Sequence, residues 1–175
     1  YQVSSVYIGG GTPSSIDEQW IAALMEGVFD CFNVLPDAEI SIECNPGTLS
    51  REKLLAYRDA GINRLSIGLQ AANNDELKQL GRIHTFEQFV TNYEVARNVG
   101  FKNINVDLMY GLPGQSASQY MATVNKIIRL HPDHISAYSL IVEKGTPFYE
   151  KYKFDMVRQE AGMRTEFLPN EDELY

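Results

Sequence analysis

The sequence predicts an α/β fold in which parallel strands alternate with helices, either a (β/α) barrel or a doubly wound sheet. Five short strand-like runs are separated by longer segments with helical periodicity and conventional start and stop signals. Strands that are separated by one helix each must run parallel, because the crossover returns the chain to the same end of the sheet. The predicted strands are residues 5–9, 39–45, 64–70, 103–111 and 134–142.

An internal repeat supports this architecture. The nine residues that begin at Gly61 (GINRLSIGL) and the nine that begin at Gly100 (GFKNINVDL) share one pattern. In each, a helix-ending glycine is followed by an anchor residue and then by an alternating strand. The distance between the two copies corresponds to one βα unit, as in a (β/α) barrel or a doubly wound sheet.

The first predicted helix is capped by Ser14 or Ser15 and has one apolar face. Apolar residues that recur three and four positions apart lie on one side of a helix, so this face is expected to cover the sheet. The face consists of Ile21, Leu24, Met25, Val28 and Phe32.

The remaining helices also have recognisable ends. The second begins at Ser50 and ends at Gly61. The third and fourth open with capping boxes, in which a Ser or Thr side chain and a Gln three residues later bond each other's backbone N–H groups. The boxes are Thr85-x-x-Gln88 and Ser116-x-x-Gln119, and Gly100 and Pro132 supply the stops.

The strands alternate between aliphatic and small polar residues, whereas strands of a parallel sheet are usually apolar on both faces. The pattern predicts that the aliphatic face meets helices and that the polar face lines the interior of a wide, incomplete barrel that holds a polar ligand. Buried Glu43 and Asp107 would need partners there. The simpler alternative is that they form structural ion pairs with Arg64 or Arg82. The polar positions are Ser41, Glu43, Asn45, Ser66, Gly68, Gln70, Asn105 and Asp107.

A glycine-rich turn follows the first strand, in the run Tyr7-Ile8-Gly9-Gly10-Gly11-Thr12-Pro13. Three successive glycines open φ > 0 and let backbone N–H groups approach a ligand closely. The alternative is a tight strand-to-helix connection without a ligand. The turn, Glu43-Cys44-Asn45, Gln70, Asp107 and Ser139-Leu140-Ile141 fall at or near the carboxyl ends of their strands, where barrels place their active sites.

Composition excludes several classes of protein. The chain has 175 residues, of which 44% are hydrophobic and 22% charged, so it is typical of a single globular domain. Its net charge of -8 and scattered basic residues argue against a nucleic-acid partner. No apolar run approaches the roughly 18 residues of a membrane span, and we expect a cytoplasmic protein without an integral membrane segment. Cys31 and Cys44 form neither a disulfide framework nor a metal knuckle by spacing.

Six ordered motifs resemble the radical S-adenosylmethionine (SAM) family of oxygen-independent coproporphyrinogen III oxidases and the related haem chaperones (HemN/HemW type). The resemblance covers roughly Val6 to Tyr152. The motifs are Gly9-Gly10-Gly11-Thr12-Pro13, Ile42-Glu43-Cys44-Asn45-Pro46-Gly47-Thr48, Asn63-Arg64-Leu65-Ser66-Ile67-Gly68-Leu69-Gln70, Leu80-Gly81-Arg82-Ile83-His84-Thr85, Asp107-Leu108-Met109-Tyr110-Gly111-Leu112-Pro113-Gly114-Gln115 and Gly145-Thr146-Pro147-Phe148-Tyr149.

The resemblance implies a partial (β/α)6 radical SAM barrel, here about five βα units with the first strand missing. It implies a [4Fe-4S] cluster whose unique iron coordinates SAM, and reductive cleavage of SAM to a 5'-deoxyadenosyl radical. By motif position, the cofactor-binding residues would be Gly10, Gly11, Thr12, Glu43, Gln70, Arg82, Asp107 and Ile141. No catalytic residue and no metal ligand is assigned.

The chain departs from the family in one respect. The cluster of the family is held by three cysteines in C-x-x-x-C-x-x-C, and this sequence contains no such run. We therefore expect a fragment that lacks the N-terminal cluster motif and the C-terminal domain. Residues 1–152 would form the barrel core, and residues 153–175 would begin the segment that leads to the C-terminal domain.

Asn45-Pro46-Gly47-Thr48 and Gly145-Thr146-Pro147-Phe148-Tyr149 resemble the haem-chaperone branch more than the oxidase branch. The resemblance thus implies a radical SAM oxidoreductase-like protein that binds SAM and haem and passes haem to an acceptor protein. An electron donor would be a further partner. The oxidase, which decarboxylates coproporphyrinogen III to protoporphyrinogen IX, is the alternative. A third hypothesis is a cluster-free (β/α) barrel that binds a phosphorylated metabolite on the glycine turn, with Glu43 or Asp107 as general base.

Overall fold

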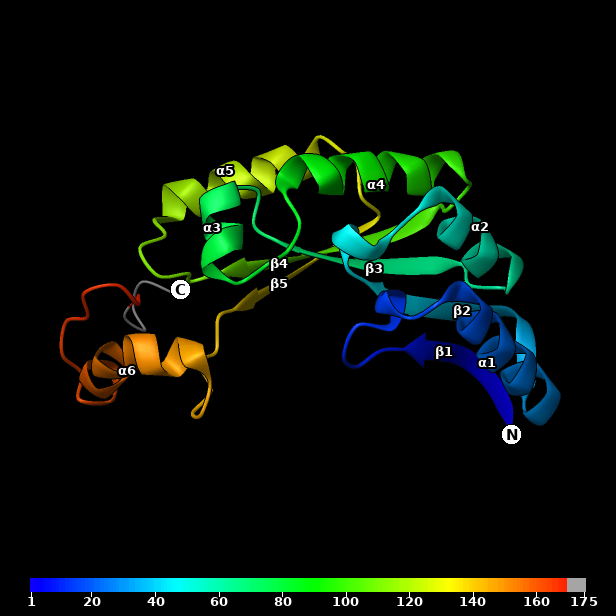
Figure 1. Cartoon of the computed structure of the whole chain (residues 1–175), viewed down its shortest axis with the longest axis horizontal. Coiled ribbons are helices and arrows are strands. Elements are labelled where there is room, and N and C mark those ends of the chain that lie inside the picture. Colours follow the sequence, from blue (N-terminus) through cyan, green and yellow to red (C-terminus); the bar gives the residue numbers. More distant parts are fainter. Residues whose placement is uncertain (170–175) are drawn as a thin grey trace.

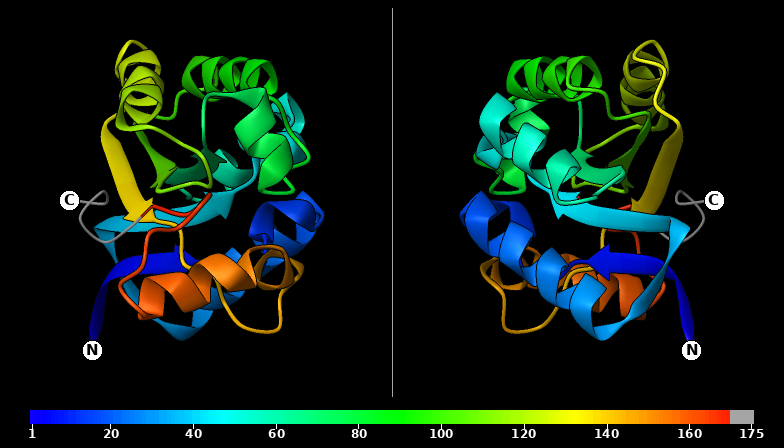
Figure 2. Two further views of the ribbon diagram at one scale, coloured as in Figure 1. Left: turned by 90° about the vertical axis from the view of Figure 1, so that its left-hand side faces the viewer. Right: turned by 90° about the vertical axis from the view of Figure 1, so that its right-hand side faces the viewer.

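Five parallel strands form one curled sheet, in the order of the chain, in a computed structural model that describes residues 1–169 (Figure 1). The curl, seen end-on in Figure 2, turns the sheet into part of a barrel wall. In a doubly wound sheet the strand order would reverse at a switch point, so the continuous order confirms the partial barrel. The strands are β1 (Gln2–Ile8), β2 (Asn33–Cys44), β3 (Arg64–Gln70), β4 (Asn103–Tyr110) and β5 (His134–Ser139).

The helices between the strands cover the outer, convex face of the sheet (Figures 1 and 2). They are α1 (Glu18–Cys31), α2 (Arg51–Asp59), α4 (Phe86–Asn98) and α5 (Ala117–Ile128), with the short α3 (Asn74–Gln79) before α4 and two 3-10 turns, η1 (Pro13–Ser15) and η2 (Pro46–Thr48). The last helix, α6 (Pro147–Glu160), lies beyond the carboxyl ends of the strands. Gln79 Nε2 donates to Tyr152 Oη at 2.8 Å, which ties α6 to α3.

The predicted alternation of the strands is confirmed. Their aliphatic residues are at most 5% exposed and pack against the helices in one core cluster. Each buried aliphatic side chain contributes about 1.5–3 kcal/mol of transfer free energy. The polar residues point to the concave side. The aliphatic set is Ile40, Ile42, Leu65, Ile67, Leu69, Ile104, Val106 and Leu108.

Most of the predicted helix ends are also confirmed. Thr85 and Ser116 form complete capping boxes with Gln88 and Gln119. Ser50 caps α2 by accepting a hydrogen bond from the backbone of the third residue of the helix. Gly61 and Gly100 follow their helices with φ of 91° and 105°, a conformation that only glycine adopts without strain.

The prediction for the first helix was partly wrong. Its N-cap is Asp17, whereas Ser14 and Ser15 belong to η1, where Ser14 is buried and bonds the residues that follow β2. Ile21 and Met25 are 1% exposed, but Leu24 and Phe32 are 48% and 58% exposed. Because α1 packs on α2 and β2 at one edge of the sheet, only part of its apolar face is covered by other elements. The helical periodicity of the sequence could not show that α1 lies at an edge.

Several strand limits differ from the prediction, most of all those of β1, β2 and β5. β2 begins at Asn33, six residues early, since its first residues pair with the start of β1. The register of the pairing then shifts between Val3 and Ser5. Pro36, which has no N–H to donate to a neighbouring strand, lies in the unpaired part of β2 at this shift. β5 ends at Ser139, before the predicted limit, and α3 and α6 were not predicted. α6 runs through the predicted boundary after residue 152, and that division of the chain stays a prediction.

Among residues 1–169, no helix combines the length and the apolar composition that a membrane crossing requires.

Two buried tyrosines on neighbouring helices provide a test of the packing. Tyr57 is fully buried, and its hydroxyl has no hydrogen-bond partner among the described residues. The hydroxyl of Tyr93 accepts hydrogen bonds from Arg97 Nη2 at 2.7 Å and Nε at 3.1 Å. Tyr57→Phe should therefore leave the free energy of unfolding unchanged or raise it by up to about 1 kcal/mol, whereas Tyr93→Phe should lower it by about 1–2 kcal/mol.

Urea denaturation of both variants beside the wild type measures the difference. A loss of more than about 1 kcal/mol in Tyr57→Phe would show that its hydroxyl has a partner, such as a buried water.

Candidate functional site

The concave face ends in a cavity of about 200 Å³ at the carboxyl ends of the strands. The curl of the sheet brings residues from all five strands or the loops that follow them to this one place. Of the eight residues predicted to contact a cofactor, six line the cavity. They are Gly11, Thr12, Glu43, Gln70, Arg82 and Asp107.

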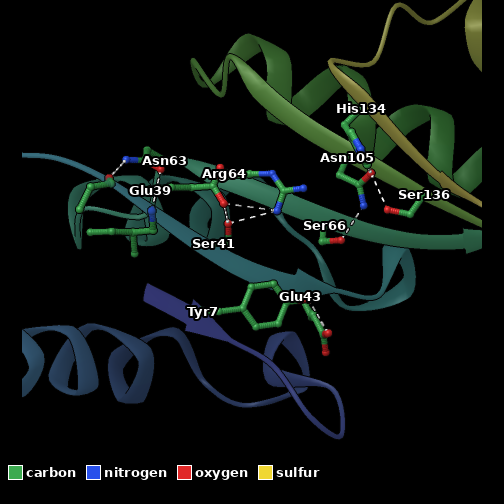
Figure 3. Close-up of polar contacts among 12 residues, drawn as sticks. Tyr7, Glu39, Ser41, Glu43, Asn63, Arg64, Ser66, Asn105, His134 and Ser136 are labelled. Carbon is green, nitrogen blue, oxygen red and sulfur yellow. Dashed lines mark hydrogen bonds and ion pairs between the residues drawn. The ribbon is translucent and has the colours of Figure 1, made fainter. Parts of the chain in front are cut away.

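Glu43, near the end of β2, holds the glycine-rich turn in place. Its Oε1 accepts a hydrogen bond from Tyr7 Oη at 2.6 Å (Figure 3), and its Oε2 accepts one from the backbone N–H of Gly10 at 3.0 Å. Burial and this contact with the carboxylate raise the pKa of Tyr7 to about 12, so the phenol stays protonated at neutral pH. One carboxylate thus joins β1, β2 and the turn between β1 and α1.

Two of the three glycines in this turn are required for different reasons. At Gly9, a Cβ atom would lie 2.6 Å from the ring of Tyr7 and 3.1 Å from Glu43 Cδ, so a side chain would displace the anchor. At Gly10, φ is 84°, which disfavours other residues, but no atom lies within 4 Å of the Cβ position. The outer side of the turn is therefore bare backbone that a ligand can approach.

Gln70 occupies a bulge at the end of β3. Its backbone has a φ of 75°, and the pairing with β4 shifts register between Gly68 and Gln70. Non-glycine residues in this region store strain and cluster at functional sites. The residue is 4% exposed, and its side-chain Oε1 accepts a hydrogen bond from Tyr138 Oη at 2.7 Å. The bulge therefore directs an amide into the cavity, where Tyr138 fixes its orientation.

Asp107, on β4, is held from the interior of the barrel by neutral donors. Asn105 Nδ2 donates to its Oδ1 at 2.7 Å, and Ser66 Oγ donates to its Oδ2 at 3.1 Å. The negative charge of Asp107, together with burial as the larger effect, raises the pKa of Tyr138. The two carboxylates, Glu43 and Asp107, thus give this side of the cavity a negative potential.

The suggested ion pairs of Glu43 and Asp107 with Arg64 or Arg82 do not form among residues 1–169. Arg64 points to the amino-terminal half of the barrel, where its Nη1 lies 3.7 Å from Glu39 Oε1 and 3.2 Å from Ser41 Oγ (Figure 3). The side chain of Arg82 has no hydrogen bond or ion pair to any described residue. The cavity therefore combines two carboxylates with one half-buried guanidinium that is free to bind an anionic group.

Two predicted residues lie outside the cavity lining. Gly10 is adjacent to it and contributes the N–H that Glu43 binds. Ile141 is 78% exposed and lies at a separate hollow between the end of β5 and α6. Tyr138, which lines the cavity, was missed by the sequence analysis. The alternation of His134, Ser136 and Tyr138 with apolar neighbours along β5 was the signal that could have identified it.

Neither cysteine forms part of a metal site. Cys31 is exposed on α1, and Cys44 is buried at the end of β2. Burial raises the pKa of the Cys44 thiol, which keeps it protonated at neutral pH. Within the described part of the chain, no group of three or more His, Cys, Asp or Glu side chains could hold a metal ion.

Residues 1–127 match the family model described as the radical SAM superfamily. The chain is 42% identical over 148 residues to "Heme chaperone HemW" of Bacillus subtilis (strain 168), a match that covers 84% of this chain and 39% of that protein. It is 36% identical over 174 residues to "Heme chaperone HemW" of Escherichia coli (strain K12), covering 99% of this chain and 43% of that protein. The chain thus spans about two fifths of the length of these relatives.

Among solved structures, the fold matches coproporphyrinogen III oxidase (HemN) from Escherichia coli, which is described as a radical SAM enzyme. The TM-score is 0.80 with 29% sequence identity, and the match covers 98% of this chain and 37% of the other. The similarity therefore extends over the whole curled sheet and its helices.

A buried histidine beside the cavity predicts a pH-dependent stability. His84 is 3% exposed, with Nδ1 at 3.1 Å from Asn45 Oδ1 and Nε2 at 3.4 Å from the Leu69 carbonyl oxygen. Burial lowers the pKa of His84, and the positive charge of Arg82 adds to the effect. The unfolded chain then binds the proton more readily than the folded one. Below the ordinary pKa of about 6.5, His84 should therefore lower the free energy of unfolding by up to about 1.4 kcal/mol per pH unit.

Urea denaturation of the wild type and of His84→Gln at pH 7.5, 6.5 and 5.5 checks this. The stability of the wild type relative to the variant should decrease as the pH falls. A difference that is constant over these pH values would contradict the prediction.

Proposed function

We propose, for a chain that belongs to the radical SAM superfamily, that its cavity binds SAM and that the whole protein acts as a haem chaperone. The observation that carries the proposal is the cavity itself. A bare glycine turn, two carboxylates and an arginine without a partner among residues 1–169 converge at the carboxyl ends of the strands, and the sequence around them is 42% identical to a curated haem chaperone.

The chemistry of the cavity fits SAM. SAM carries an ammonium, a carboxylate and a sulfonium, so it needs anionic and cationic groups together. Glu43 and Asp107 would attract its positive groups, and Arg82, which has no partner in the described structure, would bind its carboxylate. Gly10 and Gly11 leave room beside the turn, where no atom lies within 4 Å of either Cβ position. When bound, SAM is a source of an organic radical on one-electron reduction.

The residues of this chain do not fit a [4Fe-4S] cluster. Such clusters are held by at least three cysteine thiolates, whereas this sequence has two cysteines, of which Cys31 is exposed and Cys44 is buried in its protonated form. The proposal that the whole protein contains one depends on family membership alone.

The haem chaperone is preferred on sequence. Both curated relatives described above carry that name, and the identity extends over 84% and 99% of this chain. On this proposal the protein binds haem and transfers it to an acceptor protein, with an electron donor as a further partner, and acts in the cytoplasm. The polar residues described above would hold SAM rather than haem, since haem has a large apolar face.

A second function is favoured by the structural match. The E. coli coproporphyrinogen III oxidase has the same fold over 98% of the chain, at 29% identity. An oxidase would use the same SAM cavity to start the oxidative decarboxylation of a porphyrinogen propionate.

A phosphate site on the glycine turn is disfavoured by the geometry. The N–H of Gly10 already donates to Glu43, and a carboxylate at 3.0 Å from the turn would repel a phosphate.

Removal of the charge of Glu43 should weaken SAM binding. Glu43→Gln is expected to raise the dissociation constant for SAM about 10- to 100-fold, because one charge-assisted contact contributes about 1.5–3 kcal/mol. Isothermal titration calorimetry with SAM measures the change. The matched control is Glu39→Gln, four residues earlier on the same strand and outside the cavity, which should bind SAM like the wild type.

Equal affinities of the two variants would contradict the assignment of Glu43. If the wild type binds inorganic phosphate and not SAM, the phosphate-binding barrel replaces the proposal.

The two functions differ in what happens after haem or coproporphyrinogen III is added. The full natural protein, reconstituted anaerobically with iron and sulfide, should develop a stable Soret band with haem. It should form no protoporphyrinogen IX from coproporphyrinogen III in the presence of SAM and a reductant, as followed by chromatography of the oxidised porphyrins. Turnover of coproporphyrinogen III without a stable haem complex would establish the oxidase instead.

A further inference from the structure

A polar cluster with a buried centre and one exposed end lies directly beneath the cavity, in the interior of the barrel. Asn105 of β4 is at its centre and is 1% exposed, and Ser66 of β3 is 5% exposed. His134 and Ser136 of β5 complete the cluster (Figure 3). The register explains why they meet, because Ser66 pairs with Asn105 and Asn105 with His134 across neighbouring strands.

The hydrogen bonds of this cluster have one consistent direction. Ser66 has a single hydroxyl hydrogen, which it donates to Asp107 Oδ2 at 3.1 Å. The contact of 2.8 Å between Asn105 Nδ2 and Ser66 Oγ must then be donated by Asn105. The second hydrogen of the same amide goes to Asp107 Oδ1 at 2.7 Å. Both amide hydrogens of Asn105 are thus donated, one to the carboxylate of Asp107 and one to the Ser66 hydroxyl that also bonds this carboxylate.

The other end of the amide is set by β5. Asn105 Oδ1 accepts from Ser136 Oγ at 3.1 Å and lies 2.5 Å from His134 Nδ1. An amide oxygen can only accept, so the hydrogen of this short contact is on His134 Nδ1. If the amide were turned over, its oxygen would face the carboxylate of Asp107, and that contact would be repulsive. The carboxylate, which can only accept, therefore sets the orientation of the amide, and His134 and Ser136 bond the oxygen that this orientation turns to β5.

We propose that Asn105 is a positioning residue for Asp107, and that His134 and Ser136 hold its amide in the orientation that this task requires. The inference rests on the proposed function, in which Asp107 contacts bound SAM. Asp107 has no cationic partner among the described residues, so its neutral donors alone fix the plane of the carboxylate. The lone pairs that they leave free are directed to the cavity, which Asp107 lines.

The cluster also explains how the last strand contributes to the cavity. β5 reaches the cavity through Tyr138, which orients Gln70, and reaches Asp107 through Asn105. Gln70 of β3 and Asp107 of β4 are therefore both connected to β5, Gln70 directly through Tyr138 and Asp107 through Asn105.

A double-mutant cycle tests the proposal. Asn105→Leu keeps the approximate size of the side chain but removes its donors and acceptor, and it should raise the dissociation constant for SAM about 10-fold. In an Asp107→Ala background the same substitution should change the affinity less than about 2-fold, since the group to be positioned is absent. Asn103→Leu is the matched control on the same face of β4, and it should bind SAM like the wild type.

Crystal structures of the wild type and of Asn105→Leu provide a readout that does not depend on SAM. The carboxylate of Asp107 should turn away from its wild-type orientation. An equal loss of affinity in both backgrounds, or an unmoved carboxylate in Asn105→Leu, would overturn the proposal. If the wild type binds no SAM, the proposed function fails, and the orientation of the carboxylate still decides the positioning role.

A variant at the exposed end of the cluster tests the same proposal even if Asn105→Leu fails to fold. His134→Ala removes the donor from a surface position, and it should weaken SAM binding about 3-fold or more by releasing the amide. Wild-type affinity together with an unmoved Asn105 amide in its crystal structure would contradict the part assigned to His134.

Discussion

The structure depends on one constraint, that strands with an aliphatic and a polar face must bury the first under helices and satisfy the second internally. In a flat sheet covered by helices on both sides, the polar groups of β2, β3 and β4 would lie in an apolar layer. Each unpaired charge there would cost several kcal/mol. The curl places them on a common concave side, where they bond one another. Ser41, Ser66 and Asn105 are at most 5% exposed, and each has a hydrogen-bond partner from its own or a neighbouring strand.

This constraint separates two kinds of polar residue along the barrel. In the interior, Ser66 and Asn105 use their hydrogens on protein partners, so they form a rigid floor. At the carboxyl ends, Arg82 has no partner among the described residues, and Asp107 keeps lone pairs for the cavity. These groups at the carboxyl ends can bind a ligand that carries both positive and negative charges. Each group then gains a partner, and no hydrogen bond of Ser66 or Asn105 in the interior has to break.

Glu43 belongs to both groups. It binds Tyr7 and the backbone of Gly10, which keeps the glycine turn against the sheet, and it also lines the cavity. A ligand that contacts Glu43 therefore acts on the position of the turn as well. The crowded Cβ position of Gly9, 2.6 Å from the Tyr7 ring, shows how closely the anchor is packed.

The sequence by itself determined the order of the elements, the two faces of the strands and most helix ends, because these follow from local periodicity and from caps such as Thr85 and Ser116. It also selected six of the residues that the curl brings together, through motifs at the strand ends. It did not determine which apolar residues of α1 are covered, where β5 ends, or that Arg82 has no partner in the described part of the chain while Arg64 binds Glu39. Those depend on the direction of the curl and on the edge of the sheet. Tyr138 and the orientation of the Asn105 amide were decided by contacts between strands some 30 to 70 residues apart, such as Tyr138 with Gln70 and His134 with Asn105. Only tertiary structure brings such distant residues into contact, because local periodicity shows which face a side chain occupies but not which partner it meets there.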